Sequence, residues 1–252
     1  TSERLRLDRL LVSRGLGGRR DVQRLIRRGH VILEGDELRD PSQRVSIDLS
    51  LVVDGELSEP LPSLIVYHKP LHQLCTLRDP WGRSGLDHVL PLKWRESFHP
   101  VGRLDADTTG LLLFSSDGHL TQHLLHPKRK LTRRYRAVIQ ALPDNLRAQL
   151  QSGVKTQSGV FQATVEELLP FLIEEHDHFM EGYSPDHKAE GLIWLSVTEG
   201  KHRMVRRMLH NAGASVLALH REKYGQVELG DLAPGEYRIV EPQTIQALRS
   251  KT

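Results

Sequence analysis

Apolar side chains recur at helical spacing in two short segments near the amino terminus, and each segment ends in a glycine. Residues three or four apart lie on one face of an α-helix, so this spacing predicts two consecutive helices. Asp21 is predicted to cap the second helix, because a short carboxylate can accept hydrogen bonds from free backbone N–H groups. The apolar positions are Leu7, Leu10 and Leu11, then Val22, Leu25 and Ile26.

After the second helix the spacing changes from helical to extended. The run HVILEGDEL contains Glu34-Gly35-Asp36, which is typical of a hairpin turn, and the strand-like run RVSID follows it. We therefore expect a small helix-helix-hairpin domain over residues 1–57. Residues 58–63, Ser-Glu-Pro-Leu-Pro-Ser, have the composition of a linker, and a larger domain is expected over residues 64–252.

Strand-like and helix-like runs alternate in this larger domain. Several strands follow one another with too few residues between them for parallel crossovers, so we expect a mixed, mainly antiparallel sheet. The predicted fold class is α+β, with the helix-helix-hairpin module joined to this sheet domain. The strand-like runs are SLIVYHKP, GLLLFSSD, RYRAVIQAL and GLIWLSVTEG, and the helical runs are DNLRAQLQSG and HRMVRRMLHNAG.

An acidic stretch that also contains histidine, EEHDHFMEGYSPDHKAEG, interrupts the sheet pattern at residues 174–191. We expect an inserted surface loop. Four of its side chains are of types that bind metal ions, but a loop seldom provides the fixed geometry and the supporting hydrogen bonds that a metal requires. No metal site is predicted, although the ligand types are present at His176, Asp177, His178 and His187.

The overall composition indicates a folded, soluble protein. Hydrophobic residues make up 38% and charged residues 27%, which argues against a disordered chain. Cys75 is the single cysteine, so no internal disulfide can form, as suits a reducing compartment. The start TSERLRLDRLL lacks an apolar core, and no run of eighteen apolar residues occurs. We expect a cytoplasmic protein without a signal peptide or a membrane anchor.

Positive charge is concentrated at the amino terminus rather than spread over the chain. Residues 4–28 contain nine arginines against the two acids Asp8 and Asp21, and no lysine occurs before Lys69. A guanidinium group can donate two hydrogen bonds to one phosphate and can stack on a base, so the cluster favours nucleic-acid binding. The alternative is an ordinary solvated helix face.

Two carboxylates in the segment HPVGRLDADTTGLLLFSSDGHL, Asp105 and Asp107, precede a glycine and an apolar strand. One interpretation is a phosphatase motif, with Asp105 as nucleophile and a bound magnesium ion, but no pair of aspartates follows to complete the metal site. A second is the acid and base of a glycosidase, but nothing else in the chain suggests a sugar groove.

The third interpretation rests on a family resemblance. The string GRLDADTTGLL resembles the signature of the RsuA-type pseudouridine synthases, KLTRRYRAVI resembles their tyrosine strand, and EGKHRMVRRMLHNAG resembles their EGKxxQVRRM helix. LHREKYG and DLAPGEYR resemble the closing segment of the branch that modifies small-subunit ribosomal RNA. The amino-terminal segment RLDRLLVSRGLGGRRDVQRLIRRGHVILEGDEL resembles the alpha-L RNA-binding motif.

This resemblance implies an enzyme that isomerises a uridine to pseudouridine without a cofactor. Asp105 is implied to be the catalytic carboxylate, with Asp107 a variable neighbour. Tyr135 is implied to stack on the uracil, and Arg206 to hold Asp105 in its ionised form. Without the resemblance, Tyr135 has a structural alternative as a core aromatic residue, and Arg206 as an ordinary phosphate contact.

The RNA contacts are expected from the arginines of the amino-terminal module and from basic residues close in sequence to the catalytic ones. A base stacked inside folded RNA must be turned out into a pocket, and contacts to the RNA backbone supply the energy. In the strand YHKPLHQLCTL, Lys69 and Pro70 are expected to be structural, and His72 replaces the glycine of the family pattern. The expected RNA-binding residues are Arg4, Arg19, Arg20, Arg24, Arg27, Arg28, Arg103, Lys128, Lys130, Arg133, Lys201, Arg203 and Arg207.

The expected substrate is small-subunit (16S) ribosomal RNA, free or in an assembly intermediate, modified by a monomeric enzyme. Two alternatives stay open: the same reaction on large-subunit RNA, and a non-catalytic protein that binds RNA or assists ribosome assembly. The combination of Asp105, Tyr135 and Arg206 favours an enzyme over the non-catalytic alternative.

Overall fold

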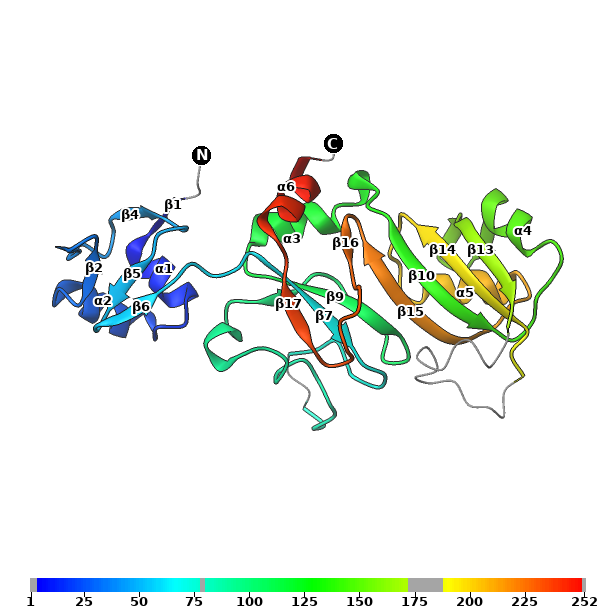
Figure 1. The fold of residues 1–252 in the computed structure, drawn as a ribbon, viewed down its shortest axis with the longest axis horizontal. Coiled ribbons are helices and arrows are strands. Elements are labelled where there is room, and N and C mark those ends of the chain that lie inside the picture. The colour runs from blue at the N-terminus through cyan, green and yellow to red at the C-terminus, as the bar shows by residue number, and fades with distance from the viewer. Residues whose placement is uncertain (1–3, 78–79, 172–187, 251–252) are drawn as a thin grey trace. The chain divides into compact units, whose positions relative to one another are not determined.

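The computed structural model describes residues 4–77, 80–171 and 188–250, and the chain forms two compact units (Figure 1). The first unit contains the chain up to Ser63 together with Leu90–His99 and Ser115–Asp117. The second contains Leu64–Val89, Pro100–Phe114 and the chain from Gly118 onward. Most of the predicted acidic loop, residues 174–187, lies outside the described residues.

The first unit contains the two predicted helices and the strands predicted after them, and a short strand that was not predicted, β1, precedes the helices. Its core consists of buried leucine, isoleucine and valine side chains from both helices and from the sheet, including Leu7, Leu11 and Ile26. A four-stranded antiparallel sheet has the order β3-β2-β5-β6, and β1 pairs with β4. The elements are β1 (Arg4–Arg6), α1 (Leu7–Ser13), α2 (Arg19–Arg27), β2 (Val31–Leu33), β3 (Asp36–Glu37), β4 (Arg44–Ser46), β5 (Leu51–Val53) and β6 (Glu56–Ser58).

The prediction that Asp21 caps the second helix is wrong. The capping residue is Gly18, and α2 begins at Arg19, so Asp21 lies inside the first turn. Its carboxylate is 3.6 Å from Nη2 of Arg24 instead of bonding backbone N–H groups. A negative charge in the first turn still interacts favourably with the helix dipole. This interaction explains why the acidic residue lies only three positions after the true capping residue.

The second unit is built on a nine-stranded sheet, whose main path is β13-β14-β10-β15-β9-β7-β17, with β16 beside β15 and β8 beside β9 (Figure 1). The pairs β13–β14, β14–β10, β10–β15, β15–β16 and β7–β17 are antiparallel, whereas β9 and β15 run parallel. The predicted mainly antiparallel α+β fold is therefore confirmed. The strands are β7 (Leu64–Lys69), β8 (His99–Pro100), β9 (Thr109–Ser115), β10 (Arg133–Ile139), β13 (Thr164–Pro170), β14 (Gly191–Val197), β15 (Val216–Tyr224), β16 (Val227–Glu228) and β17 (Tyr237–Ile239).

Short helices and one small hairpin complete this unit. Two helices pack against β7 and β9 through a cluster of buried leucines that includes Leu111, Leu124 and Leu248. Lys69 at the end of β7 is fully buried, and its Nζ donates hydrogen bonds to the carbonyl oxygens of Pro70 and Gln73. The elements are η1 (Leu92–Trp94, in the first unit), α3 (Gly118–Leu125), η2 (Pro127–Arg129), α4 (Leu146–Ser152), the hairpin β11 (Val154–Thr156) and β12 (Gly159–Phe161), α5 (Met204–Asn211) and α6 (Pro242–Ser250).

The parallel pairing of β9 with β15 brings distant parts of the chain together. Gly110 pairs with Arg221, and Arg221 pairs on its other side with Tyr135 of β10. Gly110 has φ of +101°, and a Cβ atom there would clash with the backbone of Arg221. Only glycine permits this approach, which places the segment before β9 beside β10 and β15.

None of the helices within the described residues is long and apolar enough to cross a membrane.

Candidate active site

The segment that carries Asp105 is a tight turn just before β9, held by three backbone hydrogen bonds. The N–H of Leu104 donates to Sγ of Cys75 at 3.2 Å, and the N–H of His72 donates to the carbonyl oxygen of Ala106 at 2.8 Å. Within the turn, the N–H of Thr108 donates to the carbonyl oxygen of Asp105 at 3.0 Å. The backbone that presents Asp105 is therefore fixed before Asp105, between the two aspartates and across the turn.

Asp105 borders a cavity of about 320 Å³ in the second unit, a size in the usual range for small-molecule sites. Tyr135 from β10 and Arg206 from α5 line the same cavity, so the three residues expected to be catalytic meet at one site. Leu219 and Arg221 of β15 add an apolar and a cationic wall. The register of β10, β15 and β9 explains this assembly, because Tyr135 and Arg221 are directly paired.

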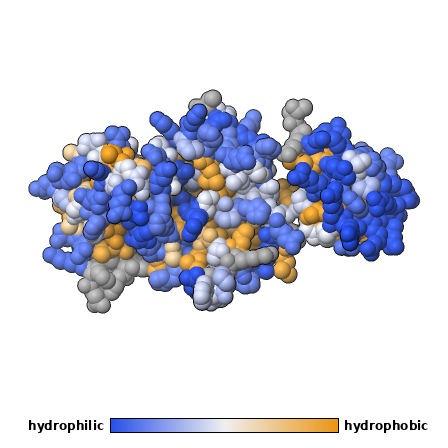
Figure 2. Space-filling model, turned by 180° about the vertical axis from the view of Figure 1, so that it is seen from behind, coloured by the Kyte–Doolittle hydropathy of each residue, from blue (hydrophilic) through white to orange (hydrophobic). Residues whose placement is uncertain are grey.

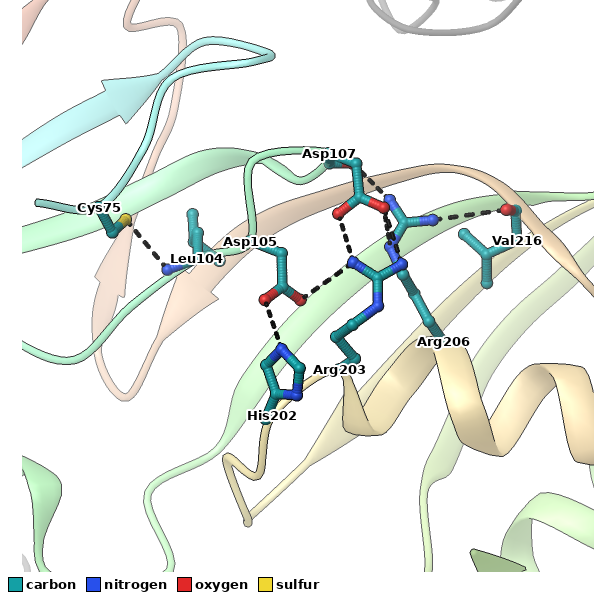
Figure 3. A network of polar contacts seen from close by, with 8 residues as sticks. All are labelled: Cys75, Leu104, Asp105, Asp107, His202, Arg203, Arg206 and Val216. Atoms are coloured by element: carbon teal, nitrogen blue, oxygen red, sulfur yellow. Dashed lines mark hydrogen bonds and ion pairs between the residues drawn. The ribbon is translucent and has the colours of Figure 1, made fainter. Parts of the chain in front are cut away.

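The strongest polar interactions at the site are made by Asp107 rather than by Asp105 (Figure 3). Two nitrogens of the Arg203 guanidinium donate to the two carboxylate oxygens of Asp107, at 3.0 and 2.9 Å. Nε of Arg206 lies 3.3 Å from the same carboxylate, and Nη2 of Arg206 donates to the carbonyl oxygen of Asp107. One aspartate thus joins two arginines of the α5 region to the turn that carries Asp105.

The expected contact between Arg206 and Asp105 is not among the ion pairs of the described residues, where Arg206 binds Asp107 instead. The Arg206 side chain is only 11% exposed, and this burial lowers its pKa, while the charge of Asp107 opposes the shift. Its Nη1 also donates to the carbonyl oxygen of Val216. Arg206 is therefore anchored on several sides and borders the cavity as a fixed cation.

Asp105 has longer contacts with one arginine and one histidine, and its carboxylate remains open to the cavity. Nη1 of Arg203 lies 4.0 Å from one carboxylate oxygen, and Nε2 of His202 lies 3.8 Å from the other. Both distances exceed that of a hydrogen bond, and the Asp105 side chain is 25% exposed. The carboxylate can thus accept a new partner without first breaking a short ion pair.

Tyr135 and Arg221 are buried in the wall of the cavity. Tyr135 is 8% exposed and Arg221 is 3% exposed. Nε of Arg221 donates to the carbonyl oxygen of Leu111 at 2.8 Å, and its guanidinium lies 5.4 Å from the ring centroid of Tyr224. Nη2 of Arg221 has no hydrogen-bond partner within the described part of the chain. The site therefore holds a buried cationic donor that the sequence analysis did not single out.

Arg133, expected among the RNA contacts, lines the cavity but is already bonded internally. It is buried, its Nη1 donates to the carbonyl oxygens of Leu131 and Thr198, and its Nη2 donates to the hydroxyl of Tyr224. Its guanidinium also lies 4.7 Å from the Tyr224 ring centroid. Arg133 therefore supports the cavity wall that it helps to form, because alternate residues of β10 point into the domain.

The other basic residues expected near the site are more accessible. Arg103, Lys128, Lys130 and Lys201 are exposed, and Arg103 and Lys201 border the cavity. Arg207 donates to the hydroxyl of Ser158 at 3.1 Å, and Arg203 binds Asp107 as described. The exposed side chains can meet an anionic ligand without disrupting internal bonds.

In the first unit, α2 presents its arginines to solvent. Arg24 is 62% exposed. The face of this unit that Figure 2 shows is largely hydrophilic. Arg4, by contrast, donates to the carbonyl oxygen of Arg44. Arg14, one of the nine arginines of the basic cluster, is buried against the carbonyl oxygens of Ile47, Leu49 and Ser58. The exposed members on or next to α2 are Arg19, Arg20, Arg24, Arg27 and Arg28.

Two features of the site escaped the sequence analysis. Asp107 was expected to be a variable neighbour, yet it is the centre of the ion-pair cluster. Arg221 was noted only as part of the motif LHREKYG. The sequence did contain a signal for the role of Asp107: several arginines at the start of one predicted helix, and two closely spaced aspartates that could pair with them. Within the described residues, no group of three His, Cys, Asp or Glu side chains is arranged to hold a metal ion.

Comparison with known proteins identifies both parts of the chain. Residues 63–211 match the family described as RNA pseudouridylate synthase, and residues 5–49 match the S4 domain. An uncharacterized RNA pseudouridine synthase of Mycobacterium leprae (strain TN) is 32% identical, with 97% of this chain and 92% of the relative aligned. A solved structure described as a pseudouridylate synthase has a TM-score of 0.60 at 24% identity, covers 97% of this chain and 99% of its own, and shows the same fold.

Two further relatives bear the name ribosomal large subunit pseudouridine synthase B. The one from Vibrio cholerae serotype O1 is 31% identical over 91% of this chain and 69% of its own length. The one from Bacillus subtilis (strain 168) is 29% identical over 97% of this chain and 96% of its own length.

An RNA-binding domain joined to a sheet domain, with a carboxylate at the edge of a nucleoside-sized cavity, defines an RNA-modifying enzyme. The chain belongs to the RNA pseudouridine synthase family and isomerises uridine to pseudouridine. The family assignment made from the sequence is confirmed, whereas these relatives do not support the small-subunit branch.

The ion-pair cluster predicts a pH-dependent contribution of Asp107 to stability. Burial opposes its ionisation, but the hydrogen bond from Arg203 and the charges of Arg206 and Arg203 prevail and lower the pKa of Asp107. A lowered folded-state pKa gives stability above the unfolded-state value of about 4, and this stability is lost as pH falls through the folded-state pKa. Asp107→Asn should therefore destabilise the protein at pH 7 and do so much less at pH 3, as measured by urea unfolding.

Asp144→Asn is the matched control, because Asp144 is exposed and lies outside the cluster. Its stability relative to the wild type should change little between the two pH values. An Asp107→Asn variant as stable as the wild type at pH 7 would contradict a stabilising role for the cluster.

Proposed function

We propose that this enzyme isomerises a uridine of large-subunit ribosomal RNA. The names of the relatives from Vibrio cholerae and Bacillus subtilis support this target over the small-subunit RNA expected from the closing motifs. We further infer that the enzyme works as a monomer in the cytoplasm, where ribosomal RNA is made.

The observation that carries the proposed chemistry is the meeting of Asp105, Tyr135 and Arg206 around one cavity. The reaction breaks the bond between ribose C1′ and N1 of uracil, turns the base, and forms a bond from C1′ to C5. The proton on C5 is then transferred, so the product has the same atoms as the substrate. Such an isomerisation requires a carboxylate, a surface that retains the free uracil, and a proton acceptor.

We assign these roles to named side chains. Asp105, whose carboxylate is open to the cavity, is the catalytic group that acts at the ribose or the base. Tyr135 stacks on the uracil and its hydroxyl relays the C5 proton. Arg206 acts indirectly. It binds Asp107 and so holds the turn in place, and its positive charge favours the ionised form of the nearby Asp105.

RNA binding must offset the cost of turning the uridine out of its stack, about a few kcal/mol. The exposed arginines of α2 are suited to contact the RNA backbone, and Lys128, Lys130 and Lys201 are suited to do so near the cavity. The S4 domain match supports an RNA-binding role for the first unit. Arg4, Arg203 and Arg207 already have internal partners and can contact RNA only with their remaining donors.

The catalytic assignment predicts the outcome of removing one charge. Ribosomal RNA from cells that lack this protein should lose a pseudouridine in the large subunit, and wild-type protein should restore it. Asp105→Asn should fail to restore the site although it is nearly isosteric, because the amide is neither a nucleophile nor a base. Asp231→Asn, at an exposed position outside the cavity, is the matched control and should restore the site.

The mapping has to cover both ribosomal RNAs with equal sensitivity. A lost site in small-subunit RNA would contradict the proposed target but not the chemistry. Restoration by Asp105→Asn would contradict the catalytic role of this carboxylate.

The first unit gives a separate prediction for RNA affinity. Replacing both Arg27 and Arg28 by alanine should weaken RNA binding and reduce the slope of log K against log salt by about 1 to 2, because each phosphate contact releases counterions. The matched control replaces Arg39 and Arg44 by alanine, which removes the same charge. These two arginines already bind Glu37 and the carbonyl oxygen of Arg4, respectively. Equal effects of the two double variants would show that net charge, and not the α2 surface, determines binding.

A further inference from the structure

The turn that carries Asp105 separates two cavities. Arg103, Leu104, Asp105 and Arg203 line both of them. The second cavity, of about 620 Å³, is completed by the turn itself and by residues of the segment 72–83. A nucleotide whose ribose reaches Asp105 and whose base enters the first cavity therefore has a second cavity beside its sugar, which an adjoining phosphodiester can enter.

The charges around the second cavity favour an anion. Three arginines, Arg83, Arg103 and Arg203, line it against the two carboxylates of Asp105 and Asp107. Arg203 and Arg206 already bind Asp107, so Arg83 and Arg103 are the lining arginines that offset Asp105 and favour a further anion. A phosphodiester entering this cavity can accept hydrogen bonds from these guanidinium groups, whose donors match the geometry of phosphate oxygens.

His72 borders the second cavity in a backbone conformation that costs stability. Its φ is +62°, in the left-handed region that side chains with a Cβ rarely adopt. Its backbone N–H donates to the carbonyl oxygen of Ala106, a bond that glycine would make equally well. The imidazole is exposed, so it does not compensate for the strain by packing in the core. Strained residues of this kind concentrate at functional sites.

We propose that the second cavity binds a phosphodiester group next to the target uridine and that the His72 imidazole contacts this phosphate. The proposal rests on the proposed function, since it extends the substrate site of the same enzyme. His72 would act in binding and positioning rather than in bond breaking. Its ring can donate a hydrogen bond to a phosphate oxygen in either tautomer or when protonated.

The substitution His72→Gly separates binding from folding. It should raise the melting temperature by about 2–4 °C, because it relieves the left-handed strain. It should also raise KM for an RNA fragment that contains the modified uridine by about tenfold, the effect of one lost hydrogen bond to a charged group, and affect kcat far less. Asparagine tolerates the left-handed backbone and keeps a hydrogen-bond donor, so the KM of His72→Asn should lie between those of the wild type and His72→Gly.

Replacing single phosphodiesters on either side of the target uridine by uncharged methylphosphonates identifies the contacted group. One replacement should raise KM for the wild type and have little effect on His72→Gly, because the two changes remove the same contact. Replacements that raise KM equally for both proteins, or that leave the wild type unaffected, would overturn the phosphate contact.

The two levels of the account fail in different ways. If the wild-type protein forms no pseudouridine in large-subunit RNA, the proposed function fails. If the wild type is active and His72→Gly has an unchanged KM, only the role of His72 is overturned.

Discussion

The carboxylate of Asp107 is the interaction on which the geometry of the site depends. It binds Arg203 through two hydrogen bonds and also contacts Arg206, so it ties the turn before β9 to the start of α5. Arg206 is largely buried, and a buried guanidinium that lost its carboxylate partner would be strongly unfavourable. The cluster therefore fixes the turn, and it also offsets the free-energy cost of placing two arginines beside the cavity.

This arrangement leaves Asp105 in a favourable state for chemistry. Nε2 of His202 and Nη1 of the Arg203 guanidinium are 3.8 and 4.0 Å away, too far to occupy the carboxylate with hydrogen bonds, while the Arg203 charge favours its negative charge. The wall opposite is formed by Tyr135 and Arg221, which the pairing of β10 with β15 places side by side. In the proposed mechanism, the residue that reacts is thus separate from the residues that hold it in place.

Much of the fold was accessible from the sequence, because helical and extended spacing are local properties. The two amino-terminal helices, the hairpin and the principal strands follow the pattern of apolar residues. The residues that meet at the cavity were found through short motifs that lie far apart in the chain. Their partners were not: the parallel pairing at Gly110, the burial of Arg133 and the preference of Arg206 for Asp107 depend on long-range packing.

The most direct test is a crystal structure of the Asp105→Asn variant with a large-subunit RNA fragment that contains its target uridine. The account predicts that this uridine is turned out of the RNA stack, with its base against Tyr135, its ribose next to residue 105, and the Asp107 cluster intact. A uridine that remains stacked in the RNA, or one bound away from the cavity shared by Asp105 and Tyr135, would contradict the account.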